Sequence, residues 1–231
     1  TRLAVRHGRK FDLSRYAGIT DPEFEAMAPF RWGGDHPLGT GFPTSSGKAR
    51  LIAVTAPAPQ FDPVFPLRLN TGRYRDQWHT MTRTGLSPKL SQHRREPLVE
   101  VHPDMVARMG LADGGLAQVE TASGKSVFRV VSTFGQRRQD IFVPIHWSDQ
   151  TSGGGRAGML PAQDRDPHSG QPGFKNTPAT IRAVTPDWTG FLVARDLPAM
   201  PDCFYWTKVK TATGWLVDGE LDVVTRSCTS P

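Results

Sequence analysis

The stretch from Leu69 to Gly85 gathers side chains that are suited to holding a large anionic ligand. It contains three arginines, a tryptophan, Trp78, and a glycine, Gly72, directly before the first arginine. Guanidinium groups bind phosphate oxygens through paired hydrogen bonds, and glycine lets a ligand approach the backbone closely. The indole offers a flat face for a ring, while Asp76 and Gln77 present donors and acceptors that suit a fused heterocycle. We interpret the stretch as a binding loop for a nucleotide-like anion; a solvated connection between strands is the alternative, because loops are polar for many reasons.

A short pattern inside this stretch carries a family resemblance. Thr-Gly-Arg at residues 71–73, followed by Trp-His-Thr at 78–80, resembles the pterin-binding segment in the C-terminal domain of bacterial assimilatory nitrate reductases. These are molybdenum enzymes of the dimethyl-sulfoxide-reductase family, and Arg-Asp-Gln at 75–77 is similar to the assimilatory branch. The resemblance implies a bis(molybdopterin guanine dinucleotide) cofactor held mainly by Thr71, Gly72, Arg73, Trp78, His79 and Thr80, with Arg75, Asp76 and Gln77 next to them.

A second segment, from Asp166 to Pro178, resembles the family's other cofactor-contacting part. It reads Asp-Pro-His-Ser-Gly-Gln-Pro and then reaches Lys175. The resemblance implies that this lysine contacts the pterin, a role that suits a compact point charge. Gly158 stands where the family has a pterin-contacting asparagine, so either that side-chain contact is lost or a local gap shifts the match. His146 and Trp147 follow a predicted strand; a surface or core position is the ordinary interpretation, and in the resembling enzymes this pair lies toward the active site.

Residues near the N-terminus predict one short helix and a lead-in to the main domain. Thr20 or Asp21 can cap a helix that has Pro22 in its first turn, with Phe24 and Met27 on one face. Segments 13–19 and 30–32 resemble the passage before the C-terminal domain of the same enzymes, and 41–50 resembles its lead-in. Without the family, residues 43–47 predict a turn and 49–54 a strand.

Short strands at even spacing predict a β-barrel for the middle of the chain. Strands are expected at 97–103, 116–121, 126–132, 141–147 and 179–184, with a helix at 104–110 and a long glycine-rich loop at 150–166. The resemblance implies a mainly β fold with short helices, the double-psi β-barrel of the aspartate-decarboxylase-like type. We expect a peripheral segment at 1–60, the cofactor-binding barrel at 61–185, and a tail at 186–231 with a hairpin of strands 204–209 and 214–221.

Composition limits the other partners. The formal net charge is +6, but lysines and arginines are scattered and no aromatic RNA-recognition motif is present, so nucleic-acid binding is the minor alternative. No run is long and apolar enough for a membrane span, and no leader opens the chain, which favours a cytoplasmic protein without membrane contact. Cys203 and Cys228 are too few to hold an iron–sulfur cluster; we expect two free thiols, with one disulfide as the alternative.

The residues alone indicate that the chemistry comes from a bound cofactor. No nucleophile triad, carboxylate pair or metal-ligand spacing stands out, so we assign no catalytic and no metal-binding residues. The resemblance implies that the whole enzyme reduces nitrate to nitrite by oxygen-atom transfer in nitrate assimilation, with the molybdenum ligand and an iron–sulfur cluster upstream of Thr1. We therefore expect a fragment that does not reduce nitrate alone, and the electron donor stays open. A formate dehydrogenase or related molybdenum enzyme, and a non-catalytic basic domain, are the alternatives.

Overall fold

The computed structural model describes residues 16–30, 42, 44–51, 53, 62–166, 170–200 and 203–221. The chain divides between residues 57 and 58 into two compact units. Outside the described residues lie Cys228, residues 167–169 and parts of the N-terminal segments named above. Within those described, no helix is long and apolar enough to cross a membrane.

The N-terminal unit contains the predicted short helix, α1 (Asp21–Glu25). The backbone N–H of Thr20 donates to the Glu23 carboxylate at 2.8 Å, and the threonine hydroxyl donates to the same oxygen at 2.7 Å. These two bonds close the first turn, as expected for a threonine three residues before a glutamate. The strand predicted from residue 49 is wrong for residues 49–51 and 53, which pair with no described strand; Leu51 is 96% exposed.

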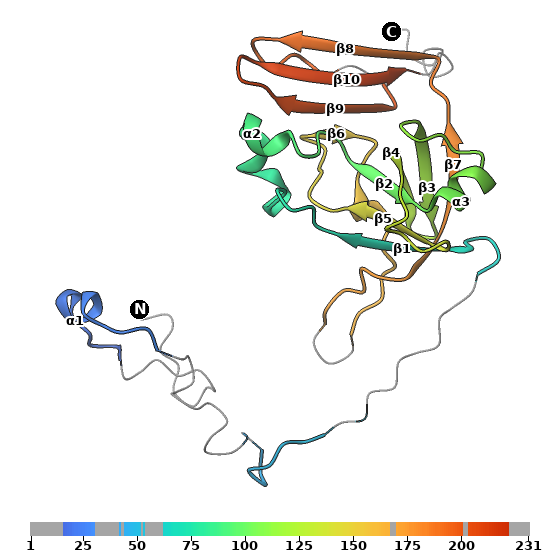
Figure 1. Ribbon diagram of the computed structural model, residues 1–231. Coiled ribbons are helices and arrows are strands. Elements are labelled where there is room, and N and C mark those ends of the chain that lie inside the picture. Colours follow the sequence, from blue (N-terminus) through green and yellow to red (C-terminus); the bar gives the residue numbers. More distant parts are fainter. Residues whose placement is uncertain are drawn as a thin grey trace, which may run out of the picture. The chain divides into compact units, whose positions relative to one another are not determined.

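The second unit is built on a closed barrel (Figure 1). Around the barrel the strands follow the order β1, β5, β2, β4, β3, β7. β1 pairs parallel with β5, β2 pairs parallel with β4, and the other pairs are antiparallel. Two interleaved parallel pairs need crossover connections rather than hairpins, and the predicted double-psi barrel is confirmed. Its strands are β1 (Leu67–Gly72), β2 (Leu98–Val101), β3 (Leu116–Thr121), β4 (Gly124–Ser132), β5 (Asp140–Pro144) and β7 (Thr177–Val184).

Alternating burial along the strands fills the barrel. In β1 every second residue is buried, beginning with Leu67, and the same period of two appears in β4. This is the pattern that a strand with one face on a core requires. Burying each large apolar side chain contributes about 1.5–3 kcal/mol. The fully enclosed interior is formed by Leu69, Val99, Val119, Phe128, Ile141 and Ile181, each at most 1% exposed.

Short helices connect the strands. The predicted helix after β2 is α3 (Pro103–Arg108); His102 Nδ1 caps it by accepting from the Asp104 N–H at 3.1 Å, and Gly110 ends it at a φ of +63°. A left-handed residue just past a helix is the usual place for glycine. The segment after β1 forms the single turns η2 (His79–Met81) and η3 (Thr84–Leu86) and then α2 (Pro88–Ser91), while η4 (Ala157–Met159) lies in the glycine-rich loop.

Several predicted strand limits shift by a few residues. β1 runs from Leu67 through Gly72, so the stretch interpreted as a binding loop begins inside a strand. β4 starts at Gly124, which leaves a two-residue hairpin loop. β5 ends at Pro144, before His146, and β7 starts two residues early, at Thr177. The prediction that residues 141–147 are all strand is therefore wrong, because Pro144 ends the pairing.

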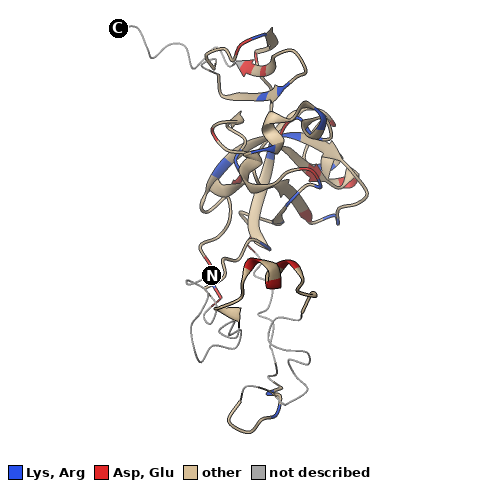
Figure 2. Ribbon diagram, turned by 90° about the vertical axis from the view of Figure 1, so that its left-hand side faces the viewer, with Lys and Arg blue, Asp and Glu red and all other residues tan. Residues whose placement is uncertain are grey.

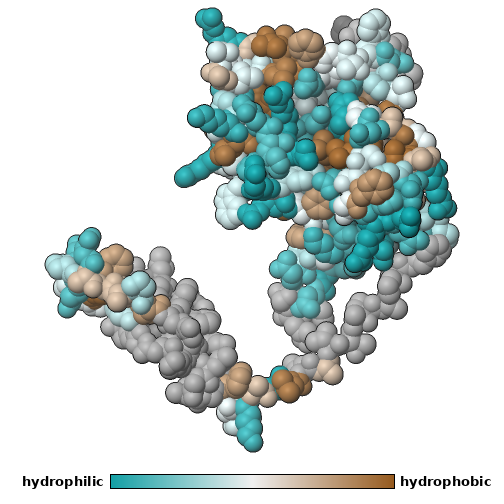
Figure 3. Space-filling view, viewed as in Figure 1, coloured by the Kyte–Doolittle hydropathy of each residue, from teal (hydrophilic) through white to brown (hydrophobic). Residues whose placement is uncertain are grey.

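The tail forms more than the expected hairpin. β9 (Tyr205–Lys210) and β10 (Trp215–Leu221) form the predicted pair, but β8 (Trp188–Ala194) adds to β10 and the two-residue β6 (Ser152–Gly153) adds to β9. The prediction of a two-stranded tail is therefore wrong. β8 exposes large apolar side chains, Trp188 and Phe191 among them, and Figure 3 shows apolar residues gathered at this end of the unit.

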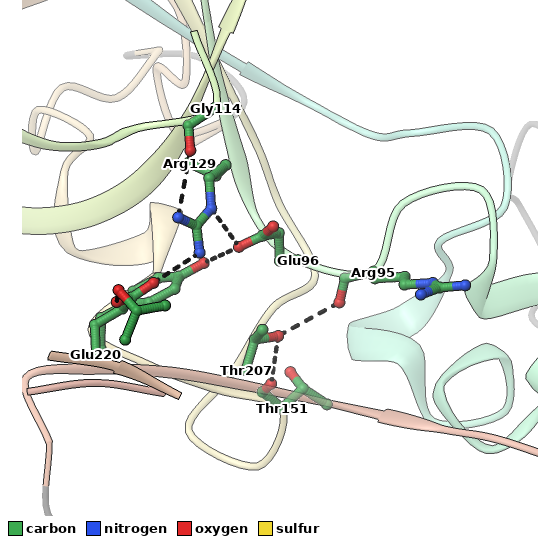
Figure 4. Close-up of polar contacts among 9 residues, drawn as sticks. Arg95, Glu96, Gly114, Arg129, Thr151, Thr207 and Glu220 are labelled. Atoms are coloured by element: carbon green, nitrogen blue, oxygen red, sulfur yellow. Dashed lines mark hydrogen bonds and ion pairs between the residues drawn. The ribbon is translucent and has the colours of Figure 1, made fainter. Parts of the chain in front are cut away.

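A polar network around Arg129 joins the barrel to the second sheet (Figure 4). The Arg129 guanidinium lies 3.1 Å from Glu96 and 3.1 Å from Glu220, which is only 2% exposed. The buried Tyr205 hydroxyl donates to Glu96 at 2.9 Å. The Thr207 hydroxyl reaches the backbone carbonyls of residues 95 and 151, at 3.4 Å each. Arg129 of the barrel, Glu96 and two residues of the second sheet, Tyr205 and Glu220, therefore share one set of hydrogen bonds, and Thr207 makes a separate pair of contacts.

Candidate functional site

Three segments meet at the end of β1. The N–H and the hydroxyl of Thr71 both donate to the Phe174 carbonyl, at 3.3 and 3.0 Å. The Lys175 ammonium donates to the Thr71 carbonyl, and the Ile145 N–H donates to the Gly72 carbonyl at 2.8 Å. The fold thus brings Lys175 onto the Thr-Gly-Arg segment, from which it is 104 residues distant in the chain. We call Thr71, Gly72, Arg73, Trp78, His79 and Lys175 the strand-end cluster.

Gly72 sits where the chain leaves no room for a side chain. A Cβ built at this position would lie 2.8 Å from Phe142 Cε2 and 3.8 Å from the Lys175 ammonium. Any larger residue would push the phenyl ring out of place, whereas the lysine would stay at van der Waals distance. The glycine is therefore required by the close packing of Phe142 on the backbone, next to the cationic group.

Arg73, Trp78 and His79 form a stack. The Arg73 Cζ lies 5.0 Å from the centroid of the Trp78 ring, and the Trp78 and His79 rings stack at 4.7 Å with 14° between their planes. Trp78 is 54% exposed, which is unusual for so large an apolar side chain. Guanidinium on an aromatic face is a favourable contact, and here it fixes Arg73 against Trp78 at the surface.

His146 is brought to the same place by the exit from β5. Its Nδ1 accepts a hydrogen bond from the Thr80 N–H at 3.3 Å, which requires the neutral ring with its proton on Nε2. Burial, and then the nearby Arg73 and His79, lower the pKa of His146 below its usual 6.5. Each cause disfavours the cationic ring. The structure thus places His146 beside Thr80 of the Trp-His-Thr segment, and its position toward a cofactor stays a prediction.

Backbone strain gathers at the site. Among the described residues, the non-glycine residues with positive φ are His79, Thr80, Met81, His146 and Asn176. All of them lie in the segments that meet here. Such conformations cost about 1–3 kcal/mol each and persist where the surroundings impose them, often at ligand sites. The conformation of these segments is therefore maintained at some cost to the free energy of unfolding.

Three of the sequence-predicted residues, Arg75, Asp76 and Gln77, make their hydrogen bonds with other protein groups of the loop. Gln77 is 1% exposed; its amide donates to the Arg94 carbonyl at 3.4 Å and accepts from the Thr84 hydroxyl at 3.1 Å. Asp76 accepts two hydrogen bonds from Arg75, both 2.8 Å, which hold the pKa of that carboxyl below its usual value. These contacts shape the loop that carries Trp78. They leave the Gln77 amide engaged by protein groups.

Thr80 also lines a cavity of about 910 Å³. Gly158 also lines it, and a Cβ there would meet nothing within 4 Å, so the position is open. Sequence reasoning did not find four charged or aromatic residues of this cavity, Asp149, Arg156, Lys208 and Trp215. No motif marks them, and the last two reach the cavity only through the second sheet. Among the described residues no group of histidine, cysteine or carboxylate side chains could hold a metal ion.

The strand-end cluster fits a large anionic, ring-bearing cofactor. Arg73 and Lys175 supply positive charge, and Trp78 supplies an exposed aromatic ring beside them. Along the ribbon in Figure 2, Lys and Arg residues are interspersed with Asp and Glu residues. The fold and site thus define a β-barrel domain with a cationic and aromatic cluster at the end of β1, of the kind that binds a charged, ring-bearing cofactor.

Comparison with known proteins gives the family. Residues 67–178 match the model described as Molydopterin dinucleotide binding domain. The chain is 40% identical to a nitrate reductase of Klebsiella oxytoca over 211 residues, 87% of this chain and 24% of that protein. A Staphylococcus aureus protein named as a formate dehydrogenase is 24% identical over 180 residues, 74% of this chain and 18% of that one. Residues 67–178 thus belong to the molybdopterin-dinucleotide-binding domains, and the likeness to a protein named nitrate reductase confirms the resemblance.

A solved structure supports the fold. Acetylene hydratase from Pelobacter acetylenicus superposes with a TM-score of 0.56 at 20% identity, covering 73% of this chain and 28% of that one. At this identity the likeness concerns the fold alone. The chain spans about a quarter of the length of the Klebsiella relative.

Proposed function

We propose that this chain is the cofactor-binding part of a cytoplasmic, assimilatory nitrate reductase. The observation that carries the proposal is that Lys175, 104 residues further along the chain, donates to the Thr71 carbonyl directly before Gly72 and Arg73. Arg73 in turn lies over the exposed ring of Trp78. The greater likeness to a nitrate reductase than to a protein named as a formate dehydrogenase supports nitrate as the substrate. In this proposal residues 61–185 hold bis(molybdopterin guanine dinucleotide), and an iron–sulfur cluster lies outside the chain.

Each residue of the strand-end cluster has a role in this proposal. Arg73 binds phosphate or pterin oxygens with its fork of N–H donors, and Lys175 supplies a second positive charge. Trp78 and His79 give a flat surface on which a ring lies, and Thr80 positions the loop through His146. Arg75, Asp76 and Gln77 act by holding the loop in shape. When bound, the molybdenum cofactor supplies the two-electron oxygen-atom transfer that converts nitrate to nitrite.

The proposal is tested by cofactor retention in the full-length protein. Arg73→Gln and Lys175→Met each remove a charge that contributes about 1.5–3 kcal/mol to a charged hydrogen bond, so cofactor binding is expected to weaken roughly tenfold or more. Molybdenum and acid-released guanine nucleotide per protein chain are the readouts. Arg83→Gln, an exposed arginine in the same stretch, serves as the matched control. Full cofactor content in both cluster variants would refute the assignment.

Substrate assays on the same preparation separate the alternatives. Turnover of nitrate with a reduced viologen and none of formate supports the nitrate assignment, and the reverse result supports a formate dehydrogenase. The 231-residue chain alone is expected to reduce no nitrate. Salt-dependent affinity for nucleic acid, without affinity for the dinucleotide cofactor, would support a non-catalytic basic domain instead.

A further inference from the structure

The outer edge of the second sheet is uncovered. β8 forms this edge, and among the strands that the structure describes it pairs with β10 alone. In Figure 1 it is the strand of the sheet that lies farthest from the barrel. Such a strand presents a row of backbone N–H and C=O groups on its outer side, which another strand can pair with.

β8 lacks the features that keep edge strands from pairing. Between Trp188 and Ala194 the sequence contains no charged residue and no proline. The ladder with β10 is unbroken over the whole strand, so no bulge bends it away. Edge strands that stay unpaired usually have one of these features, or they are very short. The strand at the opposite edge of the sheet, β6, is of the short kind, with two residues.

Large apolar side chains lie exposed on both faces of this edge. Phe191 is 76% exposed and Trp188 is 66% exposed, and an odd number of positions between them places them on opposite faces or an even number places them alike; here the alternation along a strand sets Trp188 with Leu192 and Phe191 with Val193. Trp188 and Leu192 line a hollow of about 330 Å³ together with Gly190. Apolar residues gathered in this way mark a contact surface, whereas single ones are ordinary.

Two copies of β8 are complementary in charge in one antiparallel register. With Phe191 at a two-fold axis, Asp187 of each copy lies opposite Arg195 of the other. Opposite charges in facing positions stabilise an antiparallel pair, and like charges destabilise it. A shift of one residue in one direction sets Asp187 against Asp196, and a shift in the other direction sets it against Ala194. The charges that flank the strand therefore favour the register centred on Phe191.

The same register also matches side chains by size. Trp188 lies opposite Ala194, and Leu192 lies opposite Gly190, where a Cβ would meet nothing within 4 Å. Facing residues of an antiparallel pair point to the same face of the sheet, so Leu192 of the second copy reaches the hollow that Gly190 lines. On the other face the two Phe191 rings lie opposite each other, and facing aromatic pairs are favourable.

We propose that β8 is a homodimer interface, in which the β8 strands of two copies of this chain pair antiparallel about Phe191. The two second sheets then form one continuous sheet, and the exposed edge is removed from both copies. An isologous contact of this kind closes on itself, so assembly stops at the dimer. The inference is independent of the proposed function, because no residue of the strand-end cluster takes part in the pairing.

Sedimentation velocity of the full-length protein over a dilution series measures the dimer. Phe191→Lys is expected to raise the dimer dissociation constant about a hundredfold, because both copies lose an apolar contact and two like charges then face each other. Phe134→Lys is the matched control, since Phe134 follows β4 of the barrel and is 83% exposed. It is expected to change the dissociation constant less than about twofold. Circular dichroism melting curves establish that both variants fold.

A charge exchange tests the register. Asp187→Arg alone and Arg195→Asp alone each set like charges opposite each other at both ends of the ladder. Each is expected to weaken dimerisation about two- to tenfold, and the double variant with both changes is expected to return to within about twofold of the unmodified protein. A mixture of the two single variants is expected to form the mixed dimer in preference to either homodimer.

Three results would overturn the proposal. The first is a full-length protein that stays monomeric; if the 231-residue chain dimerises while the full-length protein does not, another part of the same polypeptide covers β8, since this chain spans 24% of the Klebsiella relative. The second is a dimer that Phe191→Lys weakens no more than Phe134→Lys does. The third is a double charge exchange that weakens the dimer as much as the single changes do.

Discussion

Replacing Arg129 with methionine tests whether the second sheet depends on the barrel for its stability. The change removes the contacts to Glu96 and Glu220 at 3.1 Å each, a hydrogen bond to the Gly114 carbonyl at 3.3 Å, and the approach to the Tyr205 ring at 5.9 Å. It leaves Glu220, at 2% exposed, with the Thr189 hydroxyl as its remaining described partner, at 2.6 Å. The structural consequence is a nearly buried carboxylate without a counter-ion.

The expected loss of free energy of unfolding follows from leaving the Glu220 carboxylate buried without a counter-ion. Removing one partner of a buried ion pair costs about 3–5 kcal/mol, because the other charge stays desolvated. For a chain of this size the cost corresponds to a fall in melting temperature of roughly 6–20 °C. Urea unfolding, followed by tryptophan fluorescence and by circular dichroism, measures the loss of free energy of unfolding. The double variant Arg129→Met with Glu220→Gln is expected to regain part of the loss, since no charge is then left buried.

A matched control removes an arginine from an exposed pair. Arg138 lies 2.5 Å from Asp104, with side chains 74% and 54% exposed. Arg138→Met is expected to cost less than about 1 kcal/mol, the usual value for a surface pair. If Arg129→Met destabilised the chain no more than Arg138→Met, the network in Figure 4 would be an incidental surface contact, and its assignment as the joint between the sheets would be wrong.

Two further predictions concern the site and the second sheet. NMR titration of His146 should give a pKa below 6.5, and Arg73→Gln should raise it, because Arg73 is one of the charges that lower it. Since the pKa of His146 is lower in the folded than in the unfolded chain, the neutral ring stabilises the fold above pH 6.5, and this contribution is lost as the pH falls through the folded-state pKa. A measured His146 pKa at or above 6.5 would contradict the burial of the neutral ring. Gly153→Ala would place a Cβ 2.1 Å from Trp206 Nε1 and is expected to cost about 1–3 kcal/mol in urea unfolding. Gly190→Ala, in the same sheet with nothing within 4 Å, is the control, and equal effects of the two changes would refute the steric account.

Much of the barrel could be predicted because its strands carry local signals. The hairpin of β3 and β4 shows alternating residues around a short polar turn, and α3 ends at a glycine that the structure places at positive φ. The meeting of Lys175 with Thr71 had no local signal. It was predicted only through the family resemblance, because no periodicity in either segment indicates that β1 and β7 pair.

The missed features depend on long-range contacts. Gln77 looks like a ligand-binding amide in the sequence, but the turn after it folds back and places Thr84 on its oxygen. β6 is two residues long, and its pairing with β9 depends on Gly153 leaving room for an indole from a strand about fifty residues later. β8 differs from β6, because the apolar run from Trp188 to Ala194 between charged residues is an ordinary local signal for a strand. The prediction of a two-stranded tail was therefore wrong at a place where the sequence itself indicates a strand.

The place of the strand-end cluster on the seam between β1 and β7 has a consequence for assembly. These strands are the first and last of the barrel in chain order, and their ladder closes the cylinder. Thr71 and Lys175 continue that ladder past its last paired residues. A ligand held there bridges the two ends of the closed sheet, so it binds only a chain whose cylinder is complete and stabilises that state by mass action. A bound cofactor would then hold β1 and β7 together, and only chains with a fully folded barrel would contain it.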